Sequence, residues 1–300
     1  MNLTIIGGSG FVGKSFIDFF NRTLLKKYSI KSITIICRNK IFIPKKRHLN
    51  LKRIKIIYAD ISKIKKLPES DLFIYAAETS QASKYNNNKI IKSHKKGINN
   101  FCNLVKGFKK SKILYLSSGA VSHKNILYNP DTKYKKIYSK LKLYSETKIR
   151  SLNKFNIKCS IARLYTFIGS WLPIDQHYIL GNFINDALNN RQIVIRSRNL
   201  VIRSYMYADD MVVWLITILL NVKKKCNIYN VGSDRQIEIR KLAKLTLKLS
   251  NKNKKIMTNP LDSNYIDKYI PNINKTKKEH KLKIKYSLAK ALLLTIRNHK

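Results

Sequence analysis

A tyrosine and a lysine stand four residues apart at Tyr144 and Lys148, in the run Tyr-Ser-Glu-Thr-Lys. On a helix, positions i and i+4 share a face, so the two side chains can act together. A tyrosine hydroxyl ordinarily has a pKa of about 10, and a neighbouring ammonium favours its phenolate. Such a pair can exchange a proton with a substrate hydroxyl. The spacing therefore indicates acid–base chemistry.

The same spacing occurs at Tyr85 with Lys89 and at Tyr138 with Lys142, because the chain is rich in both residue types. The first pair lies in an asparagine run, where a chance match is expected. The second lies only six residues before Tyr144 and is a closer rival.

Tyr144 is preferred as the acid–base residue because it opens an amphipathic stretch over 144–155. A β-rich run that ends in Leu116-Ser117-Ser118 precedes it by about 26 residues. We predict that this run is a strand that places the Ser118 hydroxyl at the carboxyl edge of a sheet, where ligands bind in such folds.

Four of the ten glycines lie within the first thirteen residues. Gly7, Gly10 and Gly13 have the spacing G-x-x-G-x-x-G, after an apolar run at 2–6 and before an amphipathic run at 14–25. Glycines in such a turn let the backbone approach a pyrophosphate, and the following helix offers N–H groups and the positive end of its dipole. A purely structural turn is the alternative. The context predicts a dinucleotide site, to which the residues between the last two glycines, Phe11 and Val12, also contribute.

A nicotinamide cofactor at this site would exchange hydride while the tyrosine exchanges a proton. Sites that prefer NAD usually place Asp or Glu on the ribose hydroxyls at the end of the second strand. Here that strand is followed by Arg38, which could instead meet a 2′-phosphate, and this favours NADP over NAD. Asp60 and its neighbour Ile61, after the third strand, are predicted to contact the cofactor. An ordinary turn aspartate is the alternative for Asp60.

Short apolar, β-rich runs alternate with amphipathic patterns in the first half of the chain. Strands that are apolar throughout and separated by helices are typical of a parallel sheet covered on both faces. Right-handed crossovers then make an α/β, Rossmann-type doubly wound parallel sheet. The predicted strands are 2–6, 32–37, 54–58, 72–76, 113–116 and 159–164, and the predicted helices are 14–25, 90–108 and 144–155.

After residue 165 the alternation weakens. Further helices are predicted at 210–220, 238–249 and 287–296, and a short strand at 228–231. We therefore expect an NAD(P)-binding domain over 1–165, with a contribution from about 200–222. A smaller, interleaved C-terminal substrate region is expected over 166–300.

The chain has 61 Lys and Arg against 16 Asp and Glu, a formal net charge of +45. Such a charge is typical of proteins that bind nucleic acid or a membrane surface. However, Lys, Asn and Ile make up roughly 40% of the chain, and all three have A/T-rich codons. Lysines occur in nearly every segment from Lys14 to Lys300, without a dominant basic block. Compositional drift is therefore the favoured explanation, and no specific nucleic-acid partner is expected.

The four cysteines, Cys37, Cys102, Cys159 and Cys226, are far apart in sequence and form no CxxC motif. Neither a metal site nor a disulfide framework is predicted, and a reducing cytoplasm fits best. The most apolar later stretch, 211–220, is about half the length of a membrane span. We expect a cytoplasmic protein without membrane association.

A series of motifs over about residues 2–245 resembles the extended short-chain dehydrogenase/reductases, specifically the NAD-dependent epimerase/dehydratase family that acts on nucleotide sugars. The matching segments, in the family's order, are GGSGFVG (7–13), YADI (58–61), DLFIYAA (71–77), YLSSGAV (115–121), YSETK (144–148), ARLYTFIG (162–169), RSYMYADDMV (203–212) and IYNVGS (228–233).

The resemblance implies Ser118, Tyr144 and Lys148 as the catalytic triad. The family usually has a small hydroxyl residue before the lysine, which Thr147 supplies and Leu141, before Lys142, does not. It also implies that the alanines of the 71–77 segment lie at the cofactor. These alanines are Ala76 and Ala77.

Substrate contacts follow from the same resemblance. Arg203 and Asn182 would bind the diphosphate of a nucleotide sugar, and His177 would line the sugar pocket. Asp209 and Asp210 resemble the family's structural acidic pair, and we interpret them as a helix N-cap. A homodimer through helices 90–108 and 144–155 is a further expectation.

One difference from the family's sequence pattern bears on which of the family's reactions this chain is expected to catalyse. The family's 4,6-dehydratases carry an Asp-Glu pair directly after the catalytic hydroxyl residue, whereas this chain has Gly119 and Ala120. The sequence therefore predicts an NAD(P)-dependent nucleotide-sugar epimerase or ketoreductase, with hydride transfer at a sugar carbon. The alternatives are a dehydratase of the same family, or a non-catalytic dinucleotide-binding protein with a basic surface for polyanions.

Overall fold

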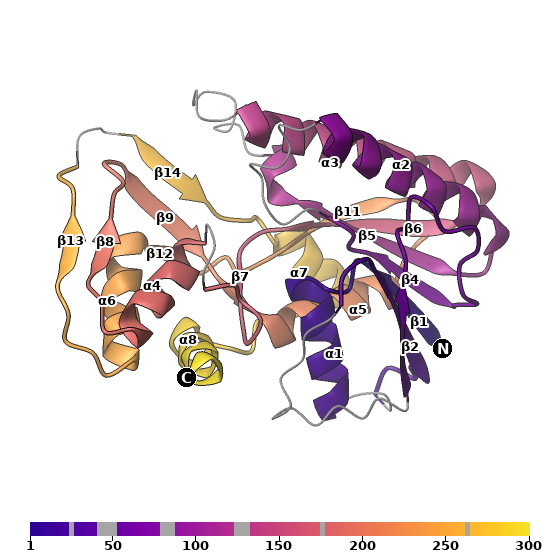
Figure 1. Cartoon of the computed structure of the whole chain (residues 1–300). Coiled ribbons are helices and arrows are strands. Elements are labelled where there is room, and N and C mark those ends of the chain that lie inside the picture. Colours follow the sequence, from indigo (N-terminus) through magenta and orange to yellow (C-terminus); the bar gives the residue numbers. More distant parts are fainter. Residues whose placement is uncertain (24–26, 41–52, 79–87, 123–132, 175–177, 262–264) are drawn as a thin grey trace. The chain divides into compact units, whose positions relative to one another are not determined.

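The computed structural model describes the chain apart from residues 24–26, 41–52, 79–87, 123–132, 175–177 and 262–264. The described chain forms two compact units (Figure 1). The first contains Met1–Leu164 and Val212–Tyr229, and the second contains Tyr165–Met211 and Asn230–Lys300.

The segment that returns to the first unit, Val212–Tyr229, differs from the predicted 200–222. The reason is strand pairing. Strand β9 (Leu200–Ser204) is hydrogen-bonded to β12 (Gln236–Glu238) and β14 (Ile266–Tyr269), and all three belong to the second unit.

A seven-stranded sheet forms the centre of the first unit, in the order β11-β6-β5-β4-β1-β2-β3. The order reverses between β1 and β4, because β2 and β3 extend from one side of β1 while β4, β5 and β6 extend from the other. All pairings from β3 through to β6 are parallel. The strands are β1 (Asn2–Ile6), β2 (Ser32–Cys37), β3 (Ile54–Tyr58), β4 (Leu72–Tyr75), β5 (Lys112–Ser118), β6 (Lys158–Leu164) and β11 (Asn227–Val231).

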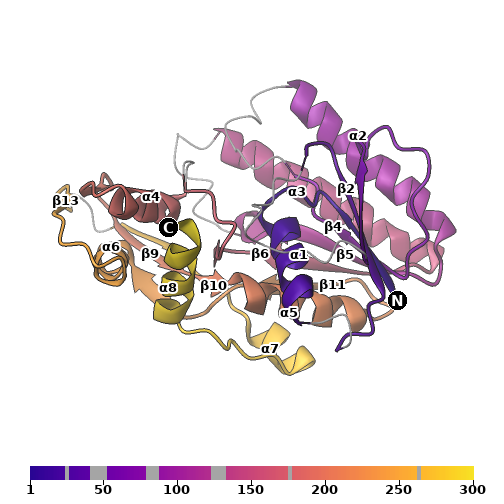
Figure 2. The same ribbon diagram turned by 60° about the horizontal axis from the view of Figure 1, so that its bottom comes forward.

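Helices lie on both faces of this sheet. In both views α2 (Asn88–Leu104) and α3 (Lys133–Ser151) lie on one face, with α1 (Phe11–Thr23) and the later part of α5 (Ala208–Leu220) on the other (Figure 1 and Figure 2). The central strands are largely buried because helices cover both faces of the sheet. The arrangement confirms the predicted Rossmann-type, doubly wound fold.

Helix α3 begins at Lys133, eleven residues before the predicted start at 144. Its early turns are rich in lysine and hide the apolar stripe there. The buried side chains of Leu141, Ser145 and Ile149 nevertheless form one continuous stripe at a spacing of four. The helix therefore carries Tyr138 and Lys142 as well as Tyr144 and Lys148.

The second unit has three small sheets, in the orders β12-β9-β14, β13-β8 and β10-β7. The remaining elements of the second unit are β7 (Phe167–Ile168), α4 (Ile179–Leu188), β8 (Ile193–Ile195), β10 (Met206–Tyr207), α6 (Ile239–Leu249), β13 (Ile256–Thr258), α7 (Asn274–His280) and α8 (Leu288–His299). Helix α6 packs against α4 and α8. Within the described ranges of both units, no helix has the length and apolar character needed to cross a membrane.

Candidate functional site

The glycine turn joins β1 to α1 at the point where the strand order reverses. Gly7 has φ +90°, a conformation that favours glycine, and its N–H donates to the carbonyl of Ile36 at 2.7 Å. A Cβ on Gly7 would overlap the backbone of Ala77, and one on Gly13 would overlap the backbone of Gly8. These two glycines are therefore required by the packing of the chain on itself.

Gly10 differs from them, because a Cβ built on it would have no atom within 4 Å. The space beside it adjoins the first turn of α1, which begins at Phe11 and contains no acidic residue. Unpaired N–H groups and the positive end of the helix dipole lie at such a start. An open face beside a helix N-terminus fits the pyrophosphate of a dinucleotide. Phe11, Val12 and the glycines would hold the cofactor there.

The two glycines predict different outcomes for the same substitution. Gly10→Ala should leave the thermal unfolding temperature within about 2 °C of the parent but weaken dinucleotide binding about 10-fold or more, because the new methyl group takes the place of the ligand. Gly13→Ala should lower the unfolding temperature without any ligand, because the backbone of Gly8 must move. Thermal unfolding with and without NAD and NADP measures both effects. Unchanged affinity in Gly10→Ala would contradict this position for the cofactor.

The other predicted cofactor residues lie at the same edge of the sheet, at or shortly after the ends of strands. Arg38 is exposed directly after β2. The Asp60 carboxylate accepts a hydrogen bond from the Ser62 N–H at 2.8 Å, so Asp60 closes a turn after β3. Ile61 is buried, and the N–H of Ala76 donates to the carbonyl of Ile6 at 2.7 Å. The geometry is that of an edge that could hold a cofactor, and the individual contacts stay predictions.

Lys142 lies on the face of α3 that meets the carboxyl end of β5. Its side chain is only 5% exposed, and its ammonium donates to the carbonyl of Leu116 at 3.0 Å and pairs with Glu78. The ammonium is 5.3 Å from the ring centroid of Tyr115 and 5.7 Å from that of Tyr138. Lys142 is thus buried at the carboxyl end of β5, with the Tyr138 ring close to it.

Glu146, one turn after Lys142, fixes this face of α3 to the sheet. Its carboxylate is buried and accepts a hydrogen bond from the Ser117 hydroxyl at 2.6 Å. The Arg163 guanidinium on β6 binds both oxygens, at 2.9 and 2.8 Å. A bidentate pair of this kind is short and directional. It sets the rotation of α3 about its axis.

Tyr144 and Lys148 share a face, as predicted, but that face packs against α2. The Tyr144 hydroxyl donates to Asn99 Oδ1 on α2 at 2.9 Å. The ammonium groups of Lys95 and Lys148 lie 5.3 and 5.4 Å from the Tyr144 ring centroid. Two residues along a helix correspond to a rotation of about 200°, so Tyr144 and Lys142 project to nearly opposite sides. Lys142 therefore faces the end of β5 and Tyr144 faces α2, and which pair is catalytic stays a prediction.

Ser118 ends β5 and accepts a hydrogen bond from the N–H of Ala120 at 3.2 Å. The Ser139 hydroxyl of α3 donates to the carbonyl of Ala120 at 3.3 Å. This bond ties the turn after Ser118 to the residue that follows Tyr138. Ser118 and Tyr138 therefore lie in two segments that this hydrogen bond joins. The sequence signal for Tyr138 was its spacing of four residues from Lys142. Tyr85, in the third pair, lies outside the described residues.

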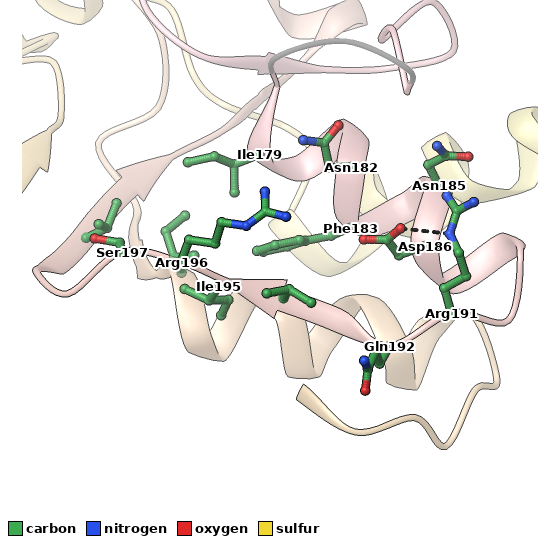
Figure 3. A pocket seen from close by; sticks show the side chains of 13 residues that line it. Ile179, Asn182, Phe183, Asn185, Asp186, Arg191, Gln192, Ile195, Arg196 and Ser197 are labelled. Carbon is green, nitrogen blue, oxygen red and sulfur yellow. Dashed lines mark hydrogen bonds and ion pairs between the residues drawn. The ribbon is translucent and has the colours of Figure 1, made fainter. Parts of the chain in front are cut away.

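A cavity of about 750 Å³ opens in the second unit, beside α4 and β8 (Figure 3). Asn182 lines it, as does Phe183, and the Arg196 guanidinium points into it. Sequence reasoning did not select Phe183 or Arg196, although an arginine directly after a short strand was a usable signal. Amide, aromatic and guanidinium groups together suit a polar ligand with an anionic part.

Arg203, on β9, is already engaged by a neighbouring carboxylate. Its guanidinium donates to Asp267 Oδ2 at 2.6 Å and to the Asp267 carbonyl at 2.7 Å. Arg203 is not among the residues that line the cavity beside Asn182. Its role toward a diphosphate stays a prediction. His177 lies outside the described residues.

The interpretation of Asp209 and Asp210 as an N-cap is wrong. Helix α5 begins at Ala208, so both aspartates lie inside its first turn. Asp210 instead accepts hydrogen bonds from the N–H groups of Lys285 and Tyr286, each at 3.1 Å. Burial raises the pKa of Asp210, and these N–H groups oppose that rise. The pair anchors the segment that precedes α8.

The strand order, the glycine turn at its reversal point and the lysine at the end of β5 define a Rossmann-type dinucleotide-binding protein. The model of the NAD dependent epimerase/dehydratase family matches residues 3–232, and the chain belongs to that family. The predicted family is confirmed.

Curated relatives of the chain are enzymes. UDP-glucuronic acid decarboxylase 3 of Arabidopsis thaliana is 24% identical over 308 residues, which cover 96% of this chain and 87% of the relative. The dTDP-D-glucose 4,6-dehydratase of Dictyostelium discoideum is 25% identical over 280 residues, covering 83% of this chain and 62% of the relative.

Solved structures share the fold over the whole chain. UDP-glucose 4-epimerase of Thermotoga maritima, solved with UDP-glucose, has a TM-score of 0.82 at 17% identity and covers 100% of this chain and 98% of its own. The dTDP-glucose 4,6-dehydratase of Bacillus anthracis, solved with NAD, has a TM-score of 0.76 at 15% identity, covering 100% and 96%. The chain is therefore assigned as an enzyme of this family, and its particular reaction is a separate question.

Proposed function

We propose that the protein is an NAD(P)-dependent epimerase or ketoreductase that transfers hydride at a carbon of a nucleotide sugar. The observation that carries this proposal is the buried Lys142 ammonium at the end of β5, beside Tyr138 and next to the turn after Ser118. The nicotinamide of a dinucleotide held by its pyrophosphate at the glycine turn would supply or accept the hydride. The chain's own residues handle the proton.

In the proposed mechanism Tyr138 takes the place first predicted for Tyr144, and Lys142 that of Lys148. The Lys142 ammonium favours the phenolate of Tyr138, which then accepts the proton from a sugar hydroxyl or returns it to a carbonyl oxygen. Ser118 orients and polarises that oxygen by a hydrogen bond. The glycine and alanine at 119 and 120 supply no carboxylate for elimination of water, which favours epimerisation or reduction.

The second unit has a cavity of its own with polar groups suited to a nucleotide sugar. Asn182 and Arg196 are proposed to bind the polar, anionic part of the nucleotide sugar in the cavity beside α4. Arg203 is a further candidate for the diphosphate, after exchange of its partner Asp267. The predicted homodimer through α2 and α3 and the predicted preference for NADP remain proposals.

The test is a binding and turnover screen with NAD and NADP against UDP-glucose, UDP-glucuronic acid and dTDP-glucose, the substrate types named by the relatives. We expect a dinucleotide and one nucleotide sugar each to raise the unfolding temperature, since a ligand that binds only the folded state stabilises it. Mass spectrometry and NMR of the product should show inversion or reduction at one sugar carbon.

Detection of a different product would contradict the proposal and indicate another reaction. Loss of water from the sugar would indicate a dehydratase, and loss of carbon dioxide a decarboxylase. Binding of a dinucleotide together with salt-sensitive binding of RNA, without turnover of any sugar, would support the non-catalytic alternative.

A further inference from the structure

A buried chain of polar side chains extends from Lys142 toward helix α2. The Glu78 carboxylate pairs with the Lys142 ammonium through one oxygen, and its other oxygen lies 3.3 Å from Nδ1 of His94. Nε2 of His94 is 2.9 Å from the Ser145 hydroxyl on α3. The side chains of His94 and Glu78 are 6% and 18% exposed. An acidic side chain so close to the site lysine has no part in the mechanism described above.

Glu78 carries its negative charge in this position. Burial by itself would raise its pKa, but the Lys142 ammonium and the hydrogen bond from His94 lower the pKa to about 2. Burial would likewise lower the pKa of Lys142, and Glu78 holds it well above its usual value. The two charges therefore coexist and offset one another across the pH range of ordinary enzymes.

This pairing changes what Lys142 can do for a neighbouring tyrosine. An unopposed ammonium favours a phenolate beside it, whereas a carboxylate in contact with that ammonium disfavours a second negative charge. Given the proposed function, in which Tyr138 and Lys142 form the acid–base pair, we propose that Glu78, held by His94, is a positioning residue that fixes the Lys142 ammonium at the end of β5 and keeps Tyr138 protonated to higher pH.

The groups that face Glu78 and Lys142 come from every described element around them. Two of these titratable groups lie on strands of the sheet, and two lie on the helices that cover it. They are Tyr75 of β4, Tyr115 of β5, His94 of α2 and Tyr138 of α3. Tyr75 and Tyr115 are fully buried, and burial raises the pKa of each, so they stay neutral while Tyr138 titrates. Glu78 is therefore the negative charge that opposes the Tyr138 phenolate within this set.

The test compares Glu78→Gln, which removes the charge, with Glu78→Asp, which retains it. In Glu78→Gln the ascending limb of the pH profile of kcat/KM should move to lower pH by about one unit or more. The descending limb should move the same way, because Lys142 loses the partner that holds its proton. Glu78→Asp should move each limb by less than about half a unit.

A second readout does not depend on turnover. Ultraviolet difference titration of each protein against the same protein carrying Tyr138→Phe isolates the ionisation of the Tyr138 phenol. We expect it at lower pH in Glu78→Gln than in the parent by the same one unit or more. If Glu78→Gln does not fold, Glu78→Leu replaces it, since it also removes the charge and should shift the titration in the same direction.

The two readouts separate the two hypotheses. A shifted Tyr138 titration in a protein that turns over no nucleotide sugar supports the role of Glu78 and overturns the proposed function. Sugar turnover with an unshifted titration and an unshifted pH profile in Glu78→Gln overturns the role of Glu78 and leaves the proposed function standing.

Discussion

Tyr138→Phe should lower kcat/KM for the nucleotide sugar by about 10²–10⁴-fold, the usual contribution of a positioned acid–base group. The substitution removes the hydroxyl that exchanges the substrate proton but keeps the ring beside the Lys142 ammonium. Binding of the dinucleotide should change little, because the ring and the lysine remain. Steady-state rates with NAD or NADP and thermal unfolding with each dinucleotide measure the two effects separately.

Tyr144→Phe is the matched control on the same helix. It removes a hydroxyl that donates to Asn99 on α2 at 2.9 Å, at a cost of about 1 kcal/mol in stability. Its kcat/KM should stay within about twofold of the parent, since nothing at the end of β5 changes. Loss of turnover in Tyr144→Phe with near-normal turnover in Tyr138→Phe would restore the original choice of pair.

Glu146→Ala should lower the free energy of unfolding of the first unit by about 3–5 kcal/mol, the cost of removing one partner from a buried ion pair. The Arg163 guanidinium would lose both of its hydrogen bonds to this carboxylate, and the Ser117 hydroxyl would lose its acceptor. The rotation of α3 would also be released, so turnover should fall together with stability. Urea unfolding followed by circular dichroism measures the loss.

Asp186→Ala supplies the control for a pair of the same chemical type near the surface. The side chains of Asp186 and Arg191 form an ion pair at 3.1 Å, and the arginine side chain is 53% exposed. Exposed pairs of this kind contribute about 0–1 kcal/mol. Equal destabilisation by the two substitutions would show that the Glu146 carboxylate is not the tie between α3 and the sheet that its contacts indicate.

The strands of the first unit were predictable because their signals are local. Six predicted strands agree with the structure to within two residues at each end, since each is an apolar run bounded by polar or glycine-containing segments. The start of α3 was not predictable, because its first turns are rich in lysine and polar residues interrupt the stripe of Leu141, Ser145 and Ile149. Because the predicted helix began at 144, it left out both Tyr138 and Lys142.

The contacts of Lys142 with Glu78, and of Glu78 with His94, could not be predicted from the sequence either. Nothing in the sequence connects Glu78 with His94 and Lys142, which are 16 and 64 residues away from it along the chain. They meet because β4, α2 and α3 are brought together by the sheet order and by helix packing on one face. A buried acid and a buried base are recognisable as a pair only once that packing is known.

The residue types, the glycine turn and the alternation of strands and helices were enough to establish the fold, the family and a Tyr–Lys pair on a helix after β5. These features depend on contacts within a few residues or on the period of one element. Which of two overlapping pairs faces the sheet is a different kind of fact, because it depends on the rotation of α3. That rotation is set by Glu146 with Ser117 and Arg163, from two strands that lie far from it in sequence, and only the folded chain brings them together.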